Sequence, residues 1–345
     1  MTQTTMTAAR PEFRAAGTDL SERRRSGVST GPLVDIAAQP DMTSMAWGAD
    51  GTLRIGASTT IAAIAGDSSI AAAYPGLTAS AQGLATPQIR HLATLGGNLA
   101  QRTRCWYYRN PHIACLKKGG SDCPARNGNH LYGVAFDLGP CVAPHPSTLA
   151  AALLAYDATV ITDRRVGLTI ADFLGNGALG TADNALLSGE LIKGIELPAA
   201  LNGERALYKR AVSRTHAEWP LVEVCARAVI EDGAFRFIRL AAGGIAPVPL
   251  RLAAVEAALT GKPANAVNIA DAAALAATGA KPLPMTGYKL DLLQGLVRDL
   301  LEQLAGSSEN AVAARLMKIG KRYAALPDTG RTPDDILGYD DGLPK

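Results

Sequence analysis

The first half of the chain alternates between short strand-like segments and segments with helical periodicity. Residues 52–57 have the alternation of a half-buried strand, and residues 61–84 repeat apolar side chains at helical spacing. Farther along, residues 146–162 include Ser147 and Thr148, either of which can cap an Ala/Leu helix that leads into a β-branched strand. The pattern predicts one α/β domain.

The second half begins near Arg205 with a different pattern. Residues 205–214 and 220–244 predict hairpin strands, whereas residues 248–261 predict a helix. Residues 290–304 place leucines at i, i+3, i+4 and i+7, which favours a helix that packs on these strands. We therefore expect an α+β domain in this half.

Length and charge refine this picture. A chain of 345 residues exceeds the usual size of a single core, so we predict a first domain over 1–200, a second over 201–305, and a C-terminal helix and tail over 306–345. The net charge of +3 gives no support to nucleic-acid binding. The chain has no apolar run of membrane-spanning length and no apolar signal core at its start. We expect a cytoplasmic protein, or a periplasmic one if a partner that carries a signal exports it.

Four of the five cysteines lie close together, at the spacing Cys105-x9-Cys115-x7-Cys123-x17-Cys141. Disulfides are disfavoured in a cytoplasmic chain. Zinc sites usually contain C-x2-4-C pairs, which are missing here, whereas the irons of a [4Fe–4S] cubane accept cysteines from separated loop positions. The spacing leaves an iron–sulfur cluster, a zinc site and unpaired thiols open. Cys225, in a strand-like segment, is interpreted as an inert core thiol.

Two glycine-bearing loops are candidates for binding a phosphate group. FRAAGTDL spans residues 13–20 and ATLGGNLAQ spans residues 93–101. Each combines small residues, which let backbone N–H groups approach a ligand, with Thr, Asp or Asn side chains that form hydrogen bonds. Neither loop matches the Rossmann or the P-loop pattern, so both of these readings fail.

The order of five sequence blocks is more informative than either loop. After the two loops come ELIKGIELP at 190–198, YKRAVSR at 208–214 and AAGGIAPVPLR at 241–251. In this order they resemble the FAD-binding subunit of molybdenum hydroxylases, the xanthine dehydrogenase and carbon monoxide dehydrogenase family. The resemblance implies an α+β fold, with a two-part FAD-binding domain of the vanillyl-alcohol-oxidase type followed by a small α+β C-terminal domain.

Residues 102–144 form an insertion that most of this family lacks. The insertion and its four cysteines resemble those of the subset that contains periplasmic aldehyde oxidoreductase and 4-hydroxybenzoyl-CoA reductase. This resemblance implies that Cys105, Cys115, Cys123 and Cys141 bind a [4Fe–4S] cluster. It also implies a large partner with the molybdenum cofactor, a small partner with two [2Fe–2S] clusters, and a soluble electron acceptor.

The expected function is electron transfer from the partner's [2Fe–2S] clusters to FAD and on to the acceptor, within a complex most like aldehyde oxidoreductase. Alternatives are a hydroxybenzoyl-CoA reductase-like or N-heterocycle-hydroxylating complex, an assembly protein without FAD, and a zinc-stabilised binding module. Because the chemistry is electron transfer, no catalytic nucleophile or general base is expected.

Carried over position by position, the resemblance implies FAD contacts from both loops and from four shorter segments. These residues are Arg14, Ala15, Ala16, Gly17, Thr18, Asp19, Leu20, Leu84, Ala85, Ile89, Ala93, Thr94, Gly97, Asn98, Ser147, Thr148, Leu191, Ile192 and Lys209. The resemblance places the apolar pair at 191–192 near the isoalloxazine ring. It implies that Lys209 stabilises the reduced anionic flavin, with an ordinary surface lysine as the alternative.

Two departures from the family pattern affect the expected flavin loops. Ala16 replaces a glycine, and alanine would be strained there if the position needs a positive φ. Thr148 replaces a common aspartate. Within the insertion, six cations either raise the potential of an anionic cluster or form a solvated or docking face: Arg102, Arg104, Arg109, Lys117, Lys118 and Arg126.

Overall fold

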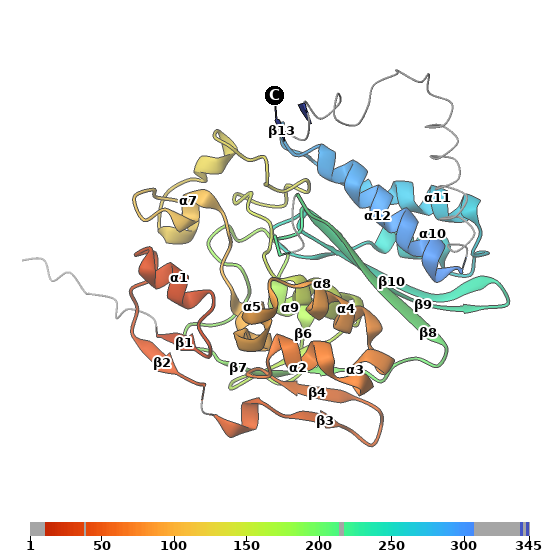
Figure 1. Ribbon diagram of the computed structural model, residues 1–345, viewed down its shortest axis with the longest axis horizontal. Coiled ribbons are helices and arrows are strands. Elements are labelled where there is room, and N and C mark those ends of the chain that lie inside the picture. The colour runs from red at the N-terminus through yellow and green to blue at the C-terminus, as the bar shows by residue number, and fades with distance from the viewer. Residues whose placement is uncertain (1–10, 38, 214–216, 307–338, 341–342, 345) are drawn as a thin grey trace, which may run out of the picture. The chain divides into compact units, whose positions relative to one another are not determined.

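The computed structural model describes residues 11–37, 39–213, 217–306, 339–340 and 343–344 (Figure 1). The chain divides into two compact units, Met1–Ala305 and Gly306–Lys345. The C-terminal helix expected after residue 305 lies outside the described residues. In the second unit, β12 (Tyr339–Asp340) pairs antiparallel with β13 (Leu343–Pro344). Among the residues described, no helix is long and apolar enough to cross a membrane.

A five-stranded antiparallel sheet is the framework of the N-terminal half. Its strand order is β3-β4-β7-β5-β6. The strands are β3 (Met45–Trp47), β4 (Leu53–Gly56), β5 (Thr159–Thr162), β6 (Leu168–Thr169) and β7 (Ile192–Leu197), with the 3₁₀ turn η1 (Pro40–Met42) before β3. A separate parallel pair, β1 (Glu12–Arg14) and β2 (Leu33–Asp35), flanks the helix α1 (Leu20–Arg25).

The helical pattern over residues 61–84 corresponds to three short helices. They are α2 (Ile61–Gly66), α3 (Ser68–Ala73) and α4 (Pro75–Gly83). The reason lies in two punctuating residues: the Asp67 side chain caps α3 by accepting from Ser69 N and Ile70 N, and Pro75 starts α4 at the first helical position. The helices α5 (Pro87–Leu92) and α6 (Leu95–Ala100) follow, each capped by a threonine.

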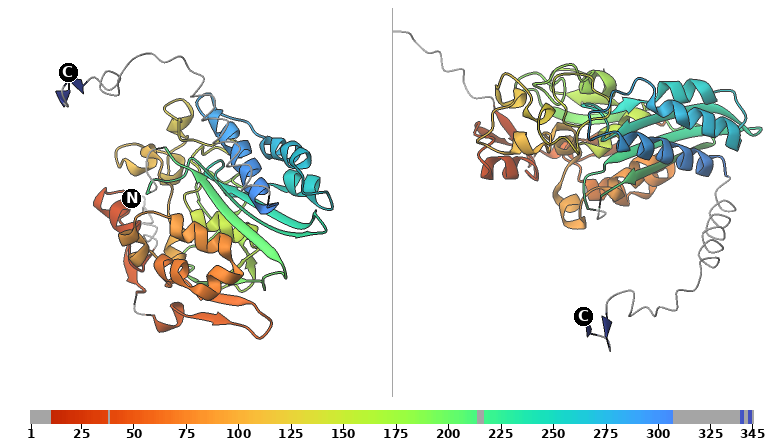
Figure 2. Two further views of the ribbon diagram at one scale, coloured as in Figure 1. Left: turned by 45° about the vertical axis from the view of Figure 1, so that its right-hand side comes forward. Right: turned by 90° about the horizontal axis from the view of Figure 1, so that it is seen from above.

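The expected hairpin strands of the C-terminal half form a second antiparallel sheet, in the order β11-β10-β9-β8. Helices α10, α11 and α12 lie along one face of this sheet, and α4 and α8 pack on the other (Figures 1 and 2). Because both faces are covered, β9 is buried at all of its first eight positions. The elements are β8 (Glu204–Ala211), β9 (Val222–Glu231), β10 (Ala234–Gly243), β11 (Leu250–Arg251), α10 (Ala253–Leu259), α11 (Ala266–Ala274), η4 (Leu275–Ala277) and α12 (Tyr288–Leu304).

The helix α8 (Thr148–Ala155) joins the two halves. All eight of its residues are buried, and it contacts α4, α6 and α9 (Ile170–Leu174) as well as β9 and β10. Ser147 caps it by accepting from Ala150 N, which confirms the predicted cap. Residues up to 305 form one compact unit, within which the boundary between 1–200 and 201–305 stays a prediction.

The cysteine-bearing insertion lies between α6 and α8 and consists mainly of loops. It contains the short helix α7 (Trp106–Arg109) and the 3₁₀ turns η2 (Leu116–Lys118) and η3 (Pro124–Arg126). A small apolar cluster of Ala125, Val134 and Val142 supports it. The cysteines at 105, 115 and 123 each immediately precede one of these three helical turns.

Candidate functional site

A cavity of about 220 Å³ collects residues from both glycine-bearing loops. The segment before the second loop and the start of α8 also contribute to its lining. The expected FAD contacts that line the cavity are Thr18, Asp19, Leu84, Ala85, Ile89, Ala93, Gly97, Asn98 and Thr148. Segments separated by more than a hundred residues in sequence therefore converge on one concave site, which we call the flavin cavity.

The first loop turns at Gly17, which has a φ of +73°. A side chain at this position would be strained, and its Cβ would lie 2.9 Å from Oγ of Ser21. Ala16 does not have a positive φ, so the alanine that replaces the family's glycine is tolerated without backbone strain. Ala85, which lines the cavity, has a φ of +47° and is one of the few non-glycine residues in that region among those described.

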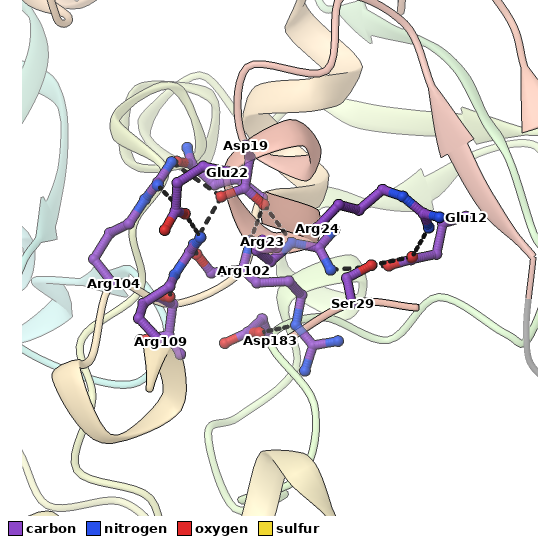
Figure 3. A network of polar contacts seen from close by, with 12 residues as sticks. Glu12, Asp19, Glu22, Arg23, Arg24, Ser29, Arg102, Arg104, Arg109 and Asp183 are labelled. Atoms are coloured by element: carbon purple, nitrogen blue, oxygen red, sulfur yellow. Dashed lines mark hydrogen bonds and ion pairs between the residues drawn. The ribbon is translucent and has the colours of Figure 1, made fainter. Parts of the chain in front are cut away.

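Asp19, at the end of the first loop, is the centre of an ion-pair network (Figure 3). Its Oδ1 lies 2.7 Å from Arg109 and 3.0 Å from Arg104, and its Oδ2 accepts from Arg23 Nε at 3.0 Å and from the backbone N–H of Arg102 at 3.2 Å. Burial would raise the pKa of Asp19, but Arg104, Arg109 and Arg23 outweigh it and lower that pKa. The carboxylate is therefore ionised and engaged by protein groups.

The second loop is fixed by hydroxyl groups. Thr94 caps α6 by accepting from Gly97 N at 3.2 Å. Ser147 donates to Oδ1 of Asn98 at 2.6 Å, and the hydroxyl of Thr148 contacts the buried Glu223 carboxylate. Burial raises the pKa of Glu223. Thr94 and Ser147 thus act from behind the cavity wall, whereas Gly97, Asn98 and Thr148 line it.

Several expected FAD contacts do not line the cavity. Lys209 is the clearest case: it points to α12, where it pairs with Asp299. Its neighbour Arg210 lines the cavity instead, because successive residues of a strand face opposite sides. Ile192 is buried in the hydrophobic core, and the partly buried Leu191 packs against that core. The other residues outside the lining are Arg14, Ala15, Ala16, Gly17, Leu20, Thr94 and Ser147.

The structure adds lining residues that the sequence did not single out for FAD. Gln101 is the last residue of the second loop, Arg104 lies in the insertion, and Trp219 precedes β9. The guanidinium of Arg104 lies 4.5 Å over the Trp219 ring, a cation–π contact that joins the insertion to the C-terminal half. In the sequence, the one signal for Arg104 as a lining residue was its position next to Cys105. No sequence feature marks Trp219 as a lining residue.

The comparisons with known proteins agree with this geometry. Residues 4–200 match the family described as the FAD binding domain in molybdopterin dehydrogenase, and residues 206–304 match the CO dehydrogenase flavoprotein C-terminal domain. The chain belongs to this family of FAD-binding subunits. It is an FAD-binding subunit of oxidoreductase complexes of the aldehyde oxidoreductase and CO dehydrogenase type.

Individual relatives of this flavin subunit are similar over most of their length. The aldehyde oxidoreductase FAD-binding subunit PaoB of Escherichia coli K12 is 33% identical over 261 residues, which are 72% of this chain and 79% of PaoB. A structure of quinoline 2-oxidoreductase from Pseudomonas putida 86 superposes with a TM-score of 0.67 at 19% identity, covering 86% of this chain and 90% of that one. Carbon monoxide dehydrogenase from Hydrogenophaga pseudoflava gives 0.66 at 21% identity, covering 85% and 88%. The expected fold class is confirmed.

A larger cavity of about 1340 Å³ adjoins the flavin cavity and shares Arg104 and Trp219 with it. Cys105 lines it on the insertion side, and Lys289 lines it from α12. Lys289 is only 1% exposed, and its Nζ donates to the carbonyl oxygens of Gly244 at 2.7 Å and Tyr132 at 3.2 Å. Burial lowers the pKa of this lysine to about 7.

All five cysteines of the flavin subunit are free thiols. Cys123 and Cys141 form a side-chain hydrogen bond, which lowers the pKa of Cys123 to about 5 and raises that of Cys141. Burial raises the pKa of Cys105, whose thiol also interacts with those of Cys123 and Cys115. Within the described part of the chain, no group of three or more His, Cys, Asp or Glu side chains is arranged to hold a metal ion.

Cys225 lies outside this group. It is fully buried in β9, and burial raises the pKa of its thiol to about 12, as expected for an inert core cysteine.

The six insertion cations are half-buried and paired, so the expectation of a solvated face is wrong. Two of the six, Arg104 and Arg109, pair with Asp19 as described above. Arg102 and Lys117 both pair with Asp183, at 2.5 and 2.8 Å. The remaining partners are Asp137 for Arg126, at 2.7 Å, and the carbonyl of Tyr107 for Lys118, at 3.0 Å. These interactions brace the insertion internally at Asp137 and against Asp19 and Asp183 outside it, and they offset most of the positive charge near the cysteines.

Proposed function

We propose that this chain is the electron-transfer subunit of an aldehyde-oxidising molybdenum hydroxylase. In this proposal a large partner holds the molybdenum cofactor, a small partner holds two [2Fe–2S] clusters, and electrons leave through FAD to a soluble acceptor. The similarity to PaoB over most of both chains supports the aldehyde oxidoreductase type over other substrates. The observation that carries the proposal is the convergence of both glycine-bearing loops on the flavin cavity.

The chain's own residues bind and orient the cofactor in this proposal. When bound, FAD supplies the step between one-electron carriers and a two-electron acceptor. Gly97 has no side chain and lets a ligand approach the backbone closely, and Asn98 has an NH₂ group to donate while Ser147 occupies its oxygen. Arg210 and Arg104 are cations of a wall that also carries three carboxylates, and their guanidinium groups suit a ligand with a pyrophosphate. Leu84 and Ile89 add apolar surface.

We further propose that Cys105, Cys115, Cys123 and Cys141 hold a [4Fe–4S] cluster. The fit rests on the donor set: the four free thiols come from one insertion, and their mutual interactions link Cys105 to Cys115 and Cys123, and Cys123 to Cys141. A cubane binds each cysteine through a different iron, so its ligands need not converge on one point. Backbone N–H groups of residues 107, 108, 125, 126, 142 and 143 interact with three of the thiols, and hydrogen bonds of this kind to the sulfurs tune the reduction potential of such a cluster.

The test is quantitation of iron, zinc, flavin and molybdenum in the complex, purified anaerobically through an affinity tag on this chain. We expect one FAD per chain, and iron from one [4Fe–4S] and two [2Fe–2S] clusters. Iron without flavin would refute the FAD role. One zinc ion per chain in place of the cluster iron would refute the [4Fe–4S] assignment. Reduction of the bound flavin by an aldehyde, and not by xanthine or a quinoline, would support the substrate class.

A further inference from the structure

Arg109 is one of two arginines whose side chains connect the cysteine insertion to the first flavin loop (Figure 3). Its Nη2 donates to Oδ1 of Asp19 at 2.7 Å and to the carbonyl of Arg102 at 2.8 Å, and its Nε donates to the carbonyl of Thr103 at 2.8 Å. Its Nη1 pairs with Glu22 of α1. The side chain is only 12% exposed. One planar guanidinium therefore connects α1, α7 and the chain that leaves the second loop.

Contacts within the protein occupy both carboxylate oxygens of Asp19, so neither is left for a ligand. Each of its two carboxylate oxygens already has two partners within the protein, from Arg104 and Arg109 on one side and from Arg23 and the backbone of Arg102 on the other. Its function is thus to fix the position of the loop. The neighbouring Thr18 lines the flavin cavity, so a shift of Asp19 would move a wall of the site.

The same segment presents the first cysteine of the insertion. Arg104 and Arg109 flank Cys105, which directly precedes α7, and the backbone N–H of Cys105 donates to Oγ1 of Thr103 at 3.3 Å. Any ordering of this segment by a metal centre is transmitted to Asp19 through two guanidinium groups. A coupling of this kind acts equally in both directions, because linkage between two binding sites is reciprocal.

We propose that Arg109 is a positioning residue that couples the insertion to the first flavin loop, so that iron loading of the cysteines raises the affinity for FAD. The inference rests on the proposed function, which supplies both ligands. It differs from an ordinary structural role, because a residue that only stabilises the fold would lower stability without making FAD affinity independent of iron.

The experiment measures the FAD dissociation constant of the full chain, after flavin removal, by quenching of flavin fluorescence. It is done with the cluster intact and after iron chelation. In the unmodified chain we expect iron removal to weaken FAD binding about tenfold. In Arg109→Gln we expect weak binding in both states. Arg109→Lys keeps the charge but cannot form the same set of contacts, so it should recover only part of the iron dependence.

Arg251→Gln is the matched control, because Arg251 forms a two-point ion pair with Glu256 and lines neither cavity. It should keep the iron dependence of the unmodified chain. If Arg109→Gln unfolds, Glu22→Gln removes one of the arginine's contacts and should give a smaller shift in the same direction. Equal FAD affinity with and without iron in the unmodified chain, or an undiminished iron dependence in Arg109→Gln, would overturn the proposal. A chain that contains no iron would instead refute the cluster assignment, and the iron assay shows this before any FAD titration.

Discussion

Ser147 donates a hydrogen bond of 2.6 Å to Oδ1 of Asn98, and the same hydroxyl accepts the backbone N–H of Ala150 at 3.1 Å. Asn98 lines the flavin cavity, whereas Ser147 begins α8, which is buried along its whole length. One hydroxyl group therefore caps the central helix and orients a side chain of the cofactor site. This double use makes the position more sensitive to substitution than an ordinary helix cap.

Ser147→Ala should lower both stability and FAD retention. We expect a loss of about 1–2 kcal/mol in the free energy of unfolding, because the cap and the buried partner of Asn98 disappear together. Denaturant unfolding and flavin content after gel filtration measure the two effects. Thr169→Ala is the control, since Thr169 caps α9 in the same way, by accepting from Asp172 N at 3.0 Å, and lines neither cavity. Full flavin occupancy in Ser147→Ala would contradict the role of Asn98.

Arg210 and Lys209 form a natural pair for testing which face of β8 meets the flavin. Arg210→Gln should weaken FAD binding, because it removes a positive charge from the cavity wall. Lys209→Gln should leave FAD binding unchanged and cost less than about 1 kcal/mol of stability, because it removes a partially exposed ion pair with Asp299. FAD dissociation constants of the two variants decide the matter. The reverse order would restore the sequence-based assignment of Lys209.

The fold was predictable where local signals were strong. The Ser147 cap, the strands that became β4 and β8 to β10, and the leucine-rich α12 all follow from periodicity and capping residues. The helical pattern over residues 61–84 is confirmed, but it did not show the division into three helices, because apolar periodicity continues across Asp67 and Pro75, which each start a new helix. Breaker residues outweighed periodicity at those two positions.

The site was predictable in its loops but not in its ion pairs. The two glycine-bearing loops and their order indicate the flavin cavity, because loop composition is a local property. The contact of Asp19 with Arg109 joins residues 90 positions apart, and no spacing rule relates them. The sequence could not show which of Lys209 and Arg210 meets the cavity for a similar reason: a strand presents alternate residues to opposite faces, and only the structure shows that Arg210 lines it. The expected contact of Lys209 with FAD stays a prediction.

Cys115→Ser should remove the iron and its visible absorbance. The thiol is buried, and a serine hydroxyl at the same place is a far poorer ligand for iron. Iron content and the spectrum of the anaerobic protein are the measurements. Cys225→Ala is the control, because Cys225 is also buried but lies in β9, among core residues. Iron content that is unchanged in Cys115→Ser, or lost in Cys225→Ala, would contradict the ligand assignment.

The buried Lys289 predicts a specific pH dependence of stability. Because burial lowers its pKa to about 7 in the folded protein from an ordinary 10.5, the unfolded chain binds more protons between these values. The free energy of unfolding should therefore rise with pH, by about 3 kcal/mol between pH 7 and 9.5. Lys289→Met should remove this rise, whereas Lys262→Met, which changes an exposed lysine of the same sheet region, should keep it. Denaturant unfolding at several pH values provides the comparison, and parallel curves for Lys289→Met and the unmodified chain would show that the lysine is charged in the folded protein.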